Sequence, residues 1–101
     1  MIVYNVTTKV HASVDLAWLH WQRHTMIKET MATGAFIAYK ILRLLEQDDS
    51  EGNTYAIQYT AADEDQYQQY LKLHAPSIHK KATEKWGDLI ISFHSSLEVI
   101  Q

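Results

Sequence analysis

The chain has no cysteine, one proline and three glycines among its 101 residues. The absence of cysteine excludes disulfides, thiol nucleophiles and thiolate metal ligands. With so few glycines the chain has no glycine-rich phosphate loop, and no serine stands in a nucleophile elbow. No pair of carboxylates stands out either, so none of the common catalytic signatures is present.

A large excess of charge and a long apolar run are also missing. The net charge is −3, which provides no basic face for nucleic acid or for an anionic membrane. No apolar run approaches the ~20 residues of a membrane-spanning helix, and the N-terminal residues lack the pattern of a signal peptide. We therefore predict a cytoplasmic protein, a single domain over residues 1–101, with no nucleic-acid or membrane partner.

The hydropathy pattern predicts four strands. Residues 2–11 and 54–61 alternate between apolar and polar side chains, which is typical of strands with one buried face. Residues 36–46 and 89–100 are rich in apolar side chains on both faces. We therefore expect the strands at 36–46 and 89–100 to be covered on both sides.

Two helical segments separate these strands. The first is expected over residues 14–33, with Ser13 as its N-cap and Gly34 as the left-handed residue that ends it. The second begins at Asp63 with a capping-box pattern, and Pro76 should kink it or divide it into two helices. On the first helix, an arc spaced at 100° per residue predicts these buried side chains: Val14, Leu16, Ala17, Trp21, Ile27, Met31 and Ala32.

The order β-α-β-β-α-β predicts an α+β, ferredoxin-like sandwich, an antiparallel four-stranded sheet with two helices on one face. RNA-recognition domains share this order, but residues 53–59 lack their glycine and basic residue. The apolar side chains on both faces of two strands would leave an exposed patch on the helix-free face. We therefore predict a homodimer in which a second copy of the chain covers that face.

Several short motifs resemble those of one family. They are Tyr4-Asn5-Val6-Thr7, Met31-Ala32-Thr33-Gly34 and Leu97-Glu98-Val99-Ile100. With them the chain resembles a short bacterial domain-of-unknown-function family, of the dimeric α/β barrel superfamily with a ferredoxin-like fold. That superfamily includes cofactor-independent oxygenases, isomerases and heme-degrading enzymes.

One family motif is not retained here. Members often carry His-Ile-Pro just before Met-Ala-Thr-Gly, whereas this chain has Met26, Ile27 and Lys28 at those positions. The nearest histidine, His24, lies two residues earlier and so on a different face of the helix. A role of the family histidine therefore does not transfer to this chain.

Histidines are the only side chains that suggest acid/base or metal chemistry. His20 and His24 are four residues apart on one helix, a spacing that lets two imidazoles reach one metal ion. No further ligand stands at a recognisable spacing, so we predict no metal and no cofactor. His24 is expected to be half-buried at the apolar arc.

The helix-free face is the predicted site for a small ligand. If Tyr4 and Val6 face the helices, alternation places Asn5 and Thr7 on the other side, and Gln58, Ser92 and His94 are expected to join them. Lys40 or Arg43 would contribute, according to whether a bulge shifts their strand. His94 is the first candidate for a functional residue and His24 the second.

Two functions are consistent with these features. The first is a small homodimeric domain that binds a small ligand or has a structural role. The alternative is a cofactor-independent enzyme, similar to monooxygenases or isomerases, with His94 or His24 as the acid/base and the substrate between sheet and helices. A titratable histidine beside a closed apolar pocket would favour the enzyme, and a filled interior would favour the first function.

Overall fold

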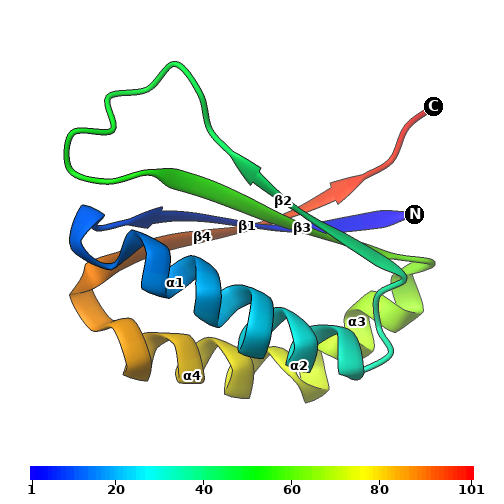
Figure 1. Cartoon of the computed structure of the whole chain (residues 1–101). Helices are drawn as coiled ribbons and strands as arrows, with labels where there is room; N and C mark the ends of the chain where they lie inside the picture. The colour runs from blue at the N-terminus through cyan, green and yellow to red at the C-terminus, as the bar shows by residue number, and fades with distance from the viewer.

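Four antiparallel strands form one twisted sheet, and the helices cover only one of its faces (Figure 1). The computed structural model describes all residues, 1–101. The strand order is β2-β3-β1-β4. The strands are β1 (Ile2–Val10), β2 (Ala38–Arg43), β3 (Thr54–Ala61) and β4 (Ile90–Glu98). This topology confirms the predicted ferredoxin-like α+β fold.

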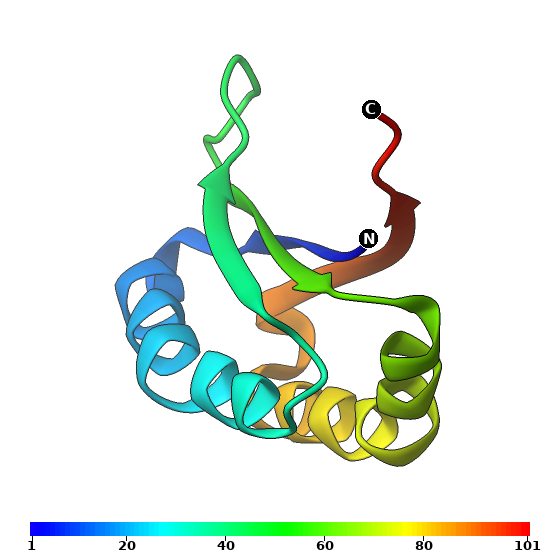
Figure 2. The same cartoon turned by 90° about the vertical axis from the view of Figure 1, so that its right-hand side faces the viewer.

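The helical segments lie together beneath the sheet, as the view along its edge shows (Figure 2). They are η1 (Ala12–Val14), α1 (Asp15–Trp21), η2 (Gln22–Met26), α2 (Ile27–Ala32), α3 (Glu64–Leu73), α4 (Ala75–Trp86) and η3 (Gly87–Leu89). None of them combines the length and the apolar character that crossing a bilayer requires.

Most of the predicted helix boundaries are confirmed. Gly34 has a φ of 79°, the left-handed conformation expected after α2. Asp63 caps α3 by accepting a hydrogen bond from the Gln66 amide at 2.9 Å. The second helical segment divides before Pro76, which lies in the first turn of α4, where its missing N–H breaks no helical hydrogen bond. The predicted Ser13 cap is wrong, because the side chain of His11 accepts the first free amide instead.

A π-helical turn, η2, interrupts the first helix between α1 and α2. Its hydrogen bond joins the Ile27 amide to the Gln22 carbonyl, five residues earlier. In a regular α-helix each four-residue step turns about 40° past a full circle, so three steps would carry a side chain about 120° around the helix. The wider π turn offsets part of this rotation. It therefore keeps Trp18, Gln22, Met26 and Thr30 together on the buried face.

The π turn also explains an error in the predicted apolar arc. Trp18 is only 1% exposed, whereas Leu16, which the arc placed inside, is 81% exposed. Trp21 is half-buried and meets Trp86 edge to face at the margin of the core. Trp18 instead stacks on Tyr55 of β3, with ring centroids 5.2 Å apart. Trp18 is therefore the tryptophan of this helix that fills the core.

The two tryptophans should differ in their contribution to stability. We expect Trp18→Ala to lower the free energy of unfolding by about 3–5 kcal/mol, because the whole buried ring is lost. Trp21→Ala should lower it clearly less, since part of that ring already lies in water. Urea denaturation of both variants checks this, and a larger loss from Trp21→Ala than from Trp18→Ala would contradict the packing described.

Candidate functional site

A cavity of about 280 Å³ lies between the sheet and the helices. Its sheet side is formed by β1, β3 and β4, and its helix side by α1, η2, α2, α3, α4 and η3. Ten of its 18 lining residues are hydrophobic, and none is an aspartate, glutamate, lysine or arginine. The cavity is therefore mainly apolar, with its polar groups limited to hydroxyls, imidazoles, one indole and one amide.

The pairing of β4 with β1 determines which side chains reach this cavity. His94 lies opposite Val6, and Ser92 lies opposite Thr8. Residues that face each other across paired strands share one face of the sheet. His94 and Ser92 therefore point to the helix-covered face, and the prediction that they lie on the helix-free face is wrong.

The other predicted ligand residues of the sheet do lie on the helix-free face. Asn5 pairs with Gln58, and its side-chain amide donates to the Thr7 hydroxyl at 2.9 Å. Lys40 pairs with Gln58, so it is Lys40 that joins this face, while Arg43 pairs with the inward-facing Tyr55. None of Asn5, Thr7 and Gln58 lines the cavity.

His24 is exposed rather than half-buried, and it does not line the cavity. Its ring lies 4.2 Å from that of His20. No group of three or more histidine and acidic side chains in the chain could hold a metal ion. Of the predicted candidates, His94 and Ser92 are thus the two that the fold brings to the cavity.

A tyrosine hydroxyl joins two histidines on the cavity wall. The Tyr4 hydroxyl lies 2.6 Å from Nε2 of His79 and 2.6 Å from Nδ1 of His94. The two imidazole rings are 4.2 Å apart. Strand β1 supplies Tyr4, β4 supplies His94 and α4 supplies His79. We call these three residues the tyrosine–histidine triad.

The chemistry of the triad follows from its hydrogen count. The Tyr4 hydroxyl has one proton, so it donates to one histidine and accepts from the other. The histidine that donates to Tyr4 has a bare nitrogen at its other ring position. The histidine that accepts from Tyr4 has its N–H there. The neutral triad therefore always presents one free acceptor and one free donor.

Burial favours the neutral form of all three groups. It raises the pKa of Tyr4 well above the usual range of tyrosine. Burial also lowers the pKa of His79 from its ordinary value, and the nearby His94 lowers it further. Partial burial lowers the pKa of His94 as well, although this residue keeps an exposed surface in the single chain. At neutral pH both histidines are therefore uncharged and can accept a proton.

The helix side of the cavity contains the π turn and two polar atoms without a partner. Gln22 and Met26, which bound the π turn, both line the cavity. The indole N–H of Trp18 and the side-chain carbonyl of Gln22 are buried without a hydrogen bond. Facing them, the Thr8 and Ser92 hydroxyls are bonded to each other at 2.8 Å. π turns often occur at functional sites.

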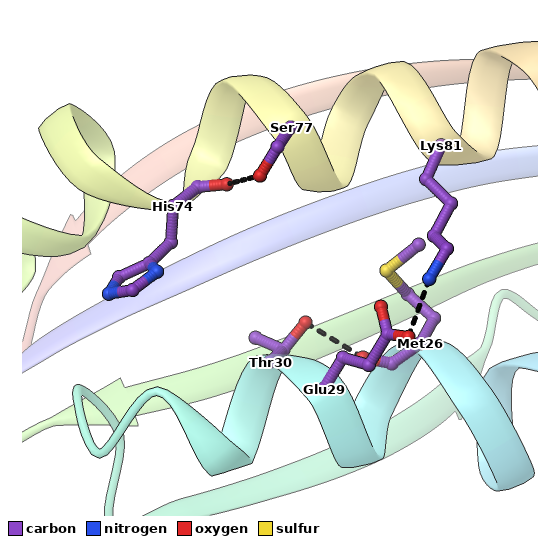
Figure 3. A network of polar contacts seen from close by, with 6 residues as sticks. All are labelled: Met26, Glu29, Thr30, His74, Ser77 and Lys81. Carbon is purple, nitrogen blue, oxygen red and sulfur yellow. Dashed lines mark hydrogen bonds and ion pairs between the residues drawn. The ribbon is translucent and has the colours of Figure 1, made fainter.

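Helices α2 and α4 lie side by side where their inner residues line the cavity (Figure 3). Lys81 of α4 reaches Glu29 of α2 with an N–O distance of 2.5 Å. The Thr30 hydroxyl, on the same helix as Glu29, donates to the Met26 carbonyl at 2.9 Å. Both charged groups are largely solvated, so the ion pair bridges the helices but adds little stability.

Sequence reasoning found one member of the triad and missed two. His94 was selected for its polar neighbours on β4. Tyr4 was expected only to face the helices, and the separation of 75 residues between it and His79 hid their contact. The sequence held two signals for these residues. Tyr4, Val6 and Thr8 occupy alternate positions of one strand and so share the face that points to the helices. His79 directly follows Ile78, an apolar residue of α4.

The antiparallel sheet, the one-sided helical layer and the cavity between them define a ferredoxin-like domain. Over residues 1–100 the chain matches the family described as a domain of unknown function (DUF4286), and it belongs to that family. This confirms the resemblance to a domain-of-unknown-function family noted from the sequence. No curated protein matches the chain in sequence.

Solved structures share the fold at low sequence identity. One is SnoaB, a cofactor-independent oxygenase from Streptomyces nogalater, with a TM-score of 0.69 and 18% identity over 99% of this chain and 94% of that one. An ethyl tert-butyl ether d (EthD) family protein from Bacillus halodurans has a TM-score of 0.68 and 17% identity, over 98% and 100%. A dimeric ferredoxin-like protein from an uncultured marine organism has a TM-score of 0.68 and 10% identity, over 100% and 96%.

The lowered histidine pKa values predict a pH dependence of stability. Between the folded pKa values and about 6.5, the unfolded chain binds more protons at these two histidines than the folded chain does. Their contribution to stability is therefore complete above about pH 6.5 and is lost as the pH falls below it.

We expect the free energy of unfolding to fall more steeply from about pH 7 to pH 5 in the wild type than in the double variant His79→Gln, His94→Gln. Urea denaturation at each pH measures this difference. NMR titration should also show His79 and His94 titrating below the value of a free imidazole. Titration at or above that value would contradict the neutral state assigned to the triad.

Proposed function

We propose that the protein is a homodimer in which each chain binds one small, mostly apolar ring compound in the cavity between sheet and helices. The observation that carries this proposal is the cavity itself. Its 280 Å³ correspond to about nine water molecules in the liquid, enough for one or two rings. Its aromatic and aliphatic lining with few polar groups is typical of ligand pockets.

The homodimer is supported by the apolar side chains of the helix-free face. On β4, Phe93 is 67%, Ile91 58% and Leu97 46% exposed in the single chain, and all three point away from the helices. A contiguous apolar patch of this kind usually marks an interface. Structures with the same fold are described as dimeric ferredoxin-like proteins. A bacterial, cytoplasmic setting stays a prediction from the sequence.

The second candidate is a cofactor-independent enzyme that uses histidine as its acid/base. The triad favours it, because two neutral imidazoles lie on the wall of a largely apolar cavity. A protein of this fold, SnoaB, is described as a cofactor-independent oxygenase. In this chain the acid/base would be His94 or His79. The exposed His24, considered from the sequence, lies outside the cavity.

Filling the cavity should abolish binding. Ala82→Phe places a ring in the cavity from α4, whereas Ala32→Phe makes the same change at an exposed position of α2. We expect wild type and Ala32→Phe to bind at least one of toluene, indole and naphthalene, and Ala82→Phe to bind none. Isothermal titration calorimetry measures this. Binding by none of the proteins, or equal binding by both variants, would overturn the proposed ligand site.

The dimer should depend on the outer face of β4. Phe93→Glu places a charge in the middle of the proposed interface, where burying it is costly. We expect sedimentation equilibrium to give about twice 11.7 kDa for the wild type and 11.7 kDa for Phe93→Glu. Leu16→Glu, at the 81% exposed Leu16 of α1, should remain dimeric. A monomeric wild type would contradict this interface.

A further inference from the structure

We propose that the ligand of the cavity is a small planar weak acid, and that the tyrosine–histidine triad takes its proton and passes it from one histidine to the other. This rests on the proposed ligand site and states what kind of molecule it accepts.

The first step concerns the place where a ligand proton can go. When Tyr4 donates to His79, His94 donates from Nδ1 to the Tyr4 oxygen, and Nε2 of His94 is bare. A ligand hydroxyl in the cavity can donate to this bare nitrogen. When Tyr4 donates to His94 instead, the roles are exchanged and the bare nitrogen is Nδ1 of His79. One acceptor is thus available in either arrangement.

The second step is the transfer itself, in which three protons move and the net charge of triad and ligand stays zero. The ligand O–H bond breaks and an N–H bond forms at His94 Nε2. The Nδ1 proton of His94 passes to the Tyr4 oxygen, and the hydroxyl proton of Tyr4 passes to His79 Nε2. His79 becomes the cation, the ligand becomes the anion, and Tyr4 and His94 end neutral. Both bonds to Tyr4 are 2.6 Å long, short enough for such a relay.

The third step concerns the charge of the ligand: the uncharged lining favours a neutral acid over a preformed anion. The lining contains no lysine or arginine, so an anion such as a carboxylate would lose its hydration with no opposite charge to pair with. A neutral acid enters without this cost, and its anion forms only together with the imidazolium. The other titratable groups in the lining are the hydroxyls of Tyr59 and Tyr70, whose pKa values burial raises, to about 12 for Tyr70. Neither of these hydroxyls competes for the proton near neutral pH.

The fourth step is the planar shape of the ligand. Rings of Tyr4, Trp18, Tyr59 and Tyr70 stand around the cavity. Aromatic side chains favour flat ligands, which can stack on their faces or meet their edges.

Charged side chains near the triad do not disturb it. The lysines and the glutamate of α4, at 80, 81, 84 and 85, are exposed and lie outside the lining.

The test uses 4-nitrophenol, a chromogenic weak acid of ten non-hydrogen atoms, with 4-nitroanisole as the matched molecule that has no acidic proton. Calorimetry in two buffers of different ionisation enthalpy, at a pH where 4-nitrophenol is mainly anionic, gives the number of protons taken up on binding. The absorption spectrum shows whether the bound molecule is the phenol or the phenolate.

For the wild type we expect uptake of one proton with the phenolate spectrum retained, which locates the proton on the triad. The double variant His79→Gln, His94→Gln has no imidazole to take the proton, so it should bind 4-nitrophenol as the neutral phenol, with the phenolate spectrum lost, and about tenfold or more weakly, since a charge-assisted hydrogen bond is removed. Its affinity for 4-nitroanisole should fall clearly less than its affinity for 4-nitrophenol. His74→Gln, a control at a histidine that packs on Tyr70 but does not line the cavity, should behave as the wild type does.

The single variants test the relay. Because the proton ends on the far histidine, we expect His79→Gln alone, and Tyr4→Phe alone, to reduce the fraction of ligand bound as phenolate although His94 is retained. A neutral phenol spectrum on binding to the wild type, no proton uptake by the wild type, or an unreduced phenolate fraction in both single variants would overturn the proposal. If 4-nitroanisole also fails to bind, the ligand site itself is refuted; if it binds, only the proton transfer is.

Discussion

The antiparallel pairing of β4 with β1 is the constraint on which the rest of the structure depends. It sets His94 opposite Val6 and Ser92 opposite Thr8, so that both reach the cavity, and it leaves Phe93 on the other side. A slip of one residue would exchange the two faces of β4. The imidazole would then lie on the outer face and the phenyl ring inside, and both the triad and the apolar patch would be lost.

The π turn is the second device that builds the site. It keeps the inner face of the first helix aligned over three successive steps, from Trp18 through Gln22 and Met26 to Thr30. Polar atoms of Trp18 and Gln22 on this face are buried without a partner, which lowers stability.

The sequence predicted those features that depend on local chemistry. The strand at 54–61, the stop at Gly34, the cap at Asp63 and the break before Pro76 each follow from side chains within a few residues. The face of His94 could not be derived in this way, because parity along β4 has no meaning until its register with β1 is known. The π turn was also hidden, since Gln22–Met26 has no residue pattern that distinguishes it from an α-helix.

The triad was hidden for a related reason. Tyr4, His79 and His94 come from three elements, and only the packing of α4 against the sheet brings His79 to Tyr4. Asn5, Thr7 and Gln58 were placed on the correct face, but none of them lines the cavity between sheet and helices. Local patterns therefore identified the elements and their stops, while the site depended on contacts between residues 75 and 90 positions apart.

The alternation of β4 has a consequence for thermodynamic linkage. Ser92 and His94 face the cavity, and Ile91, Phe93 and Leu97, which alternate with them, face the proposed partner chain. One short backbone segment thus belongs to two equilibria, occupancy of the interior and self-association. Linkage is reciprocal: by whatever factor association of two chains raises the affinity for a ligand, the ligand raises the association constant by the same factor. Raising either the protein concentration or the ligand concentration would then shift both equilibria, since both involve the edge strand β4.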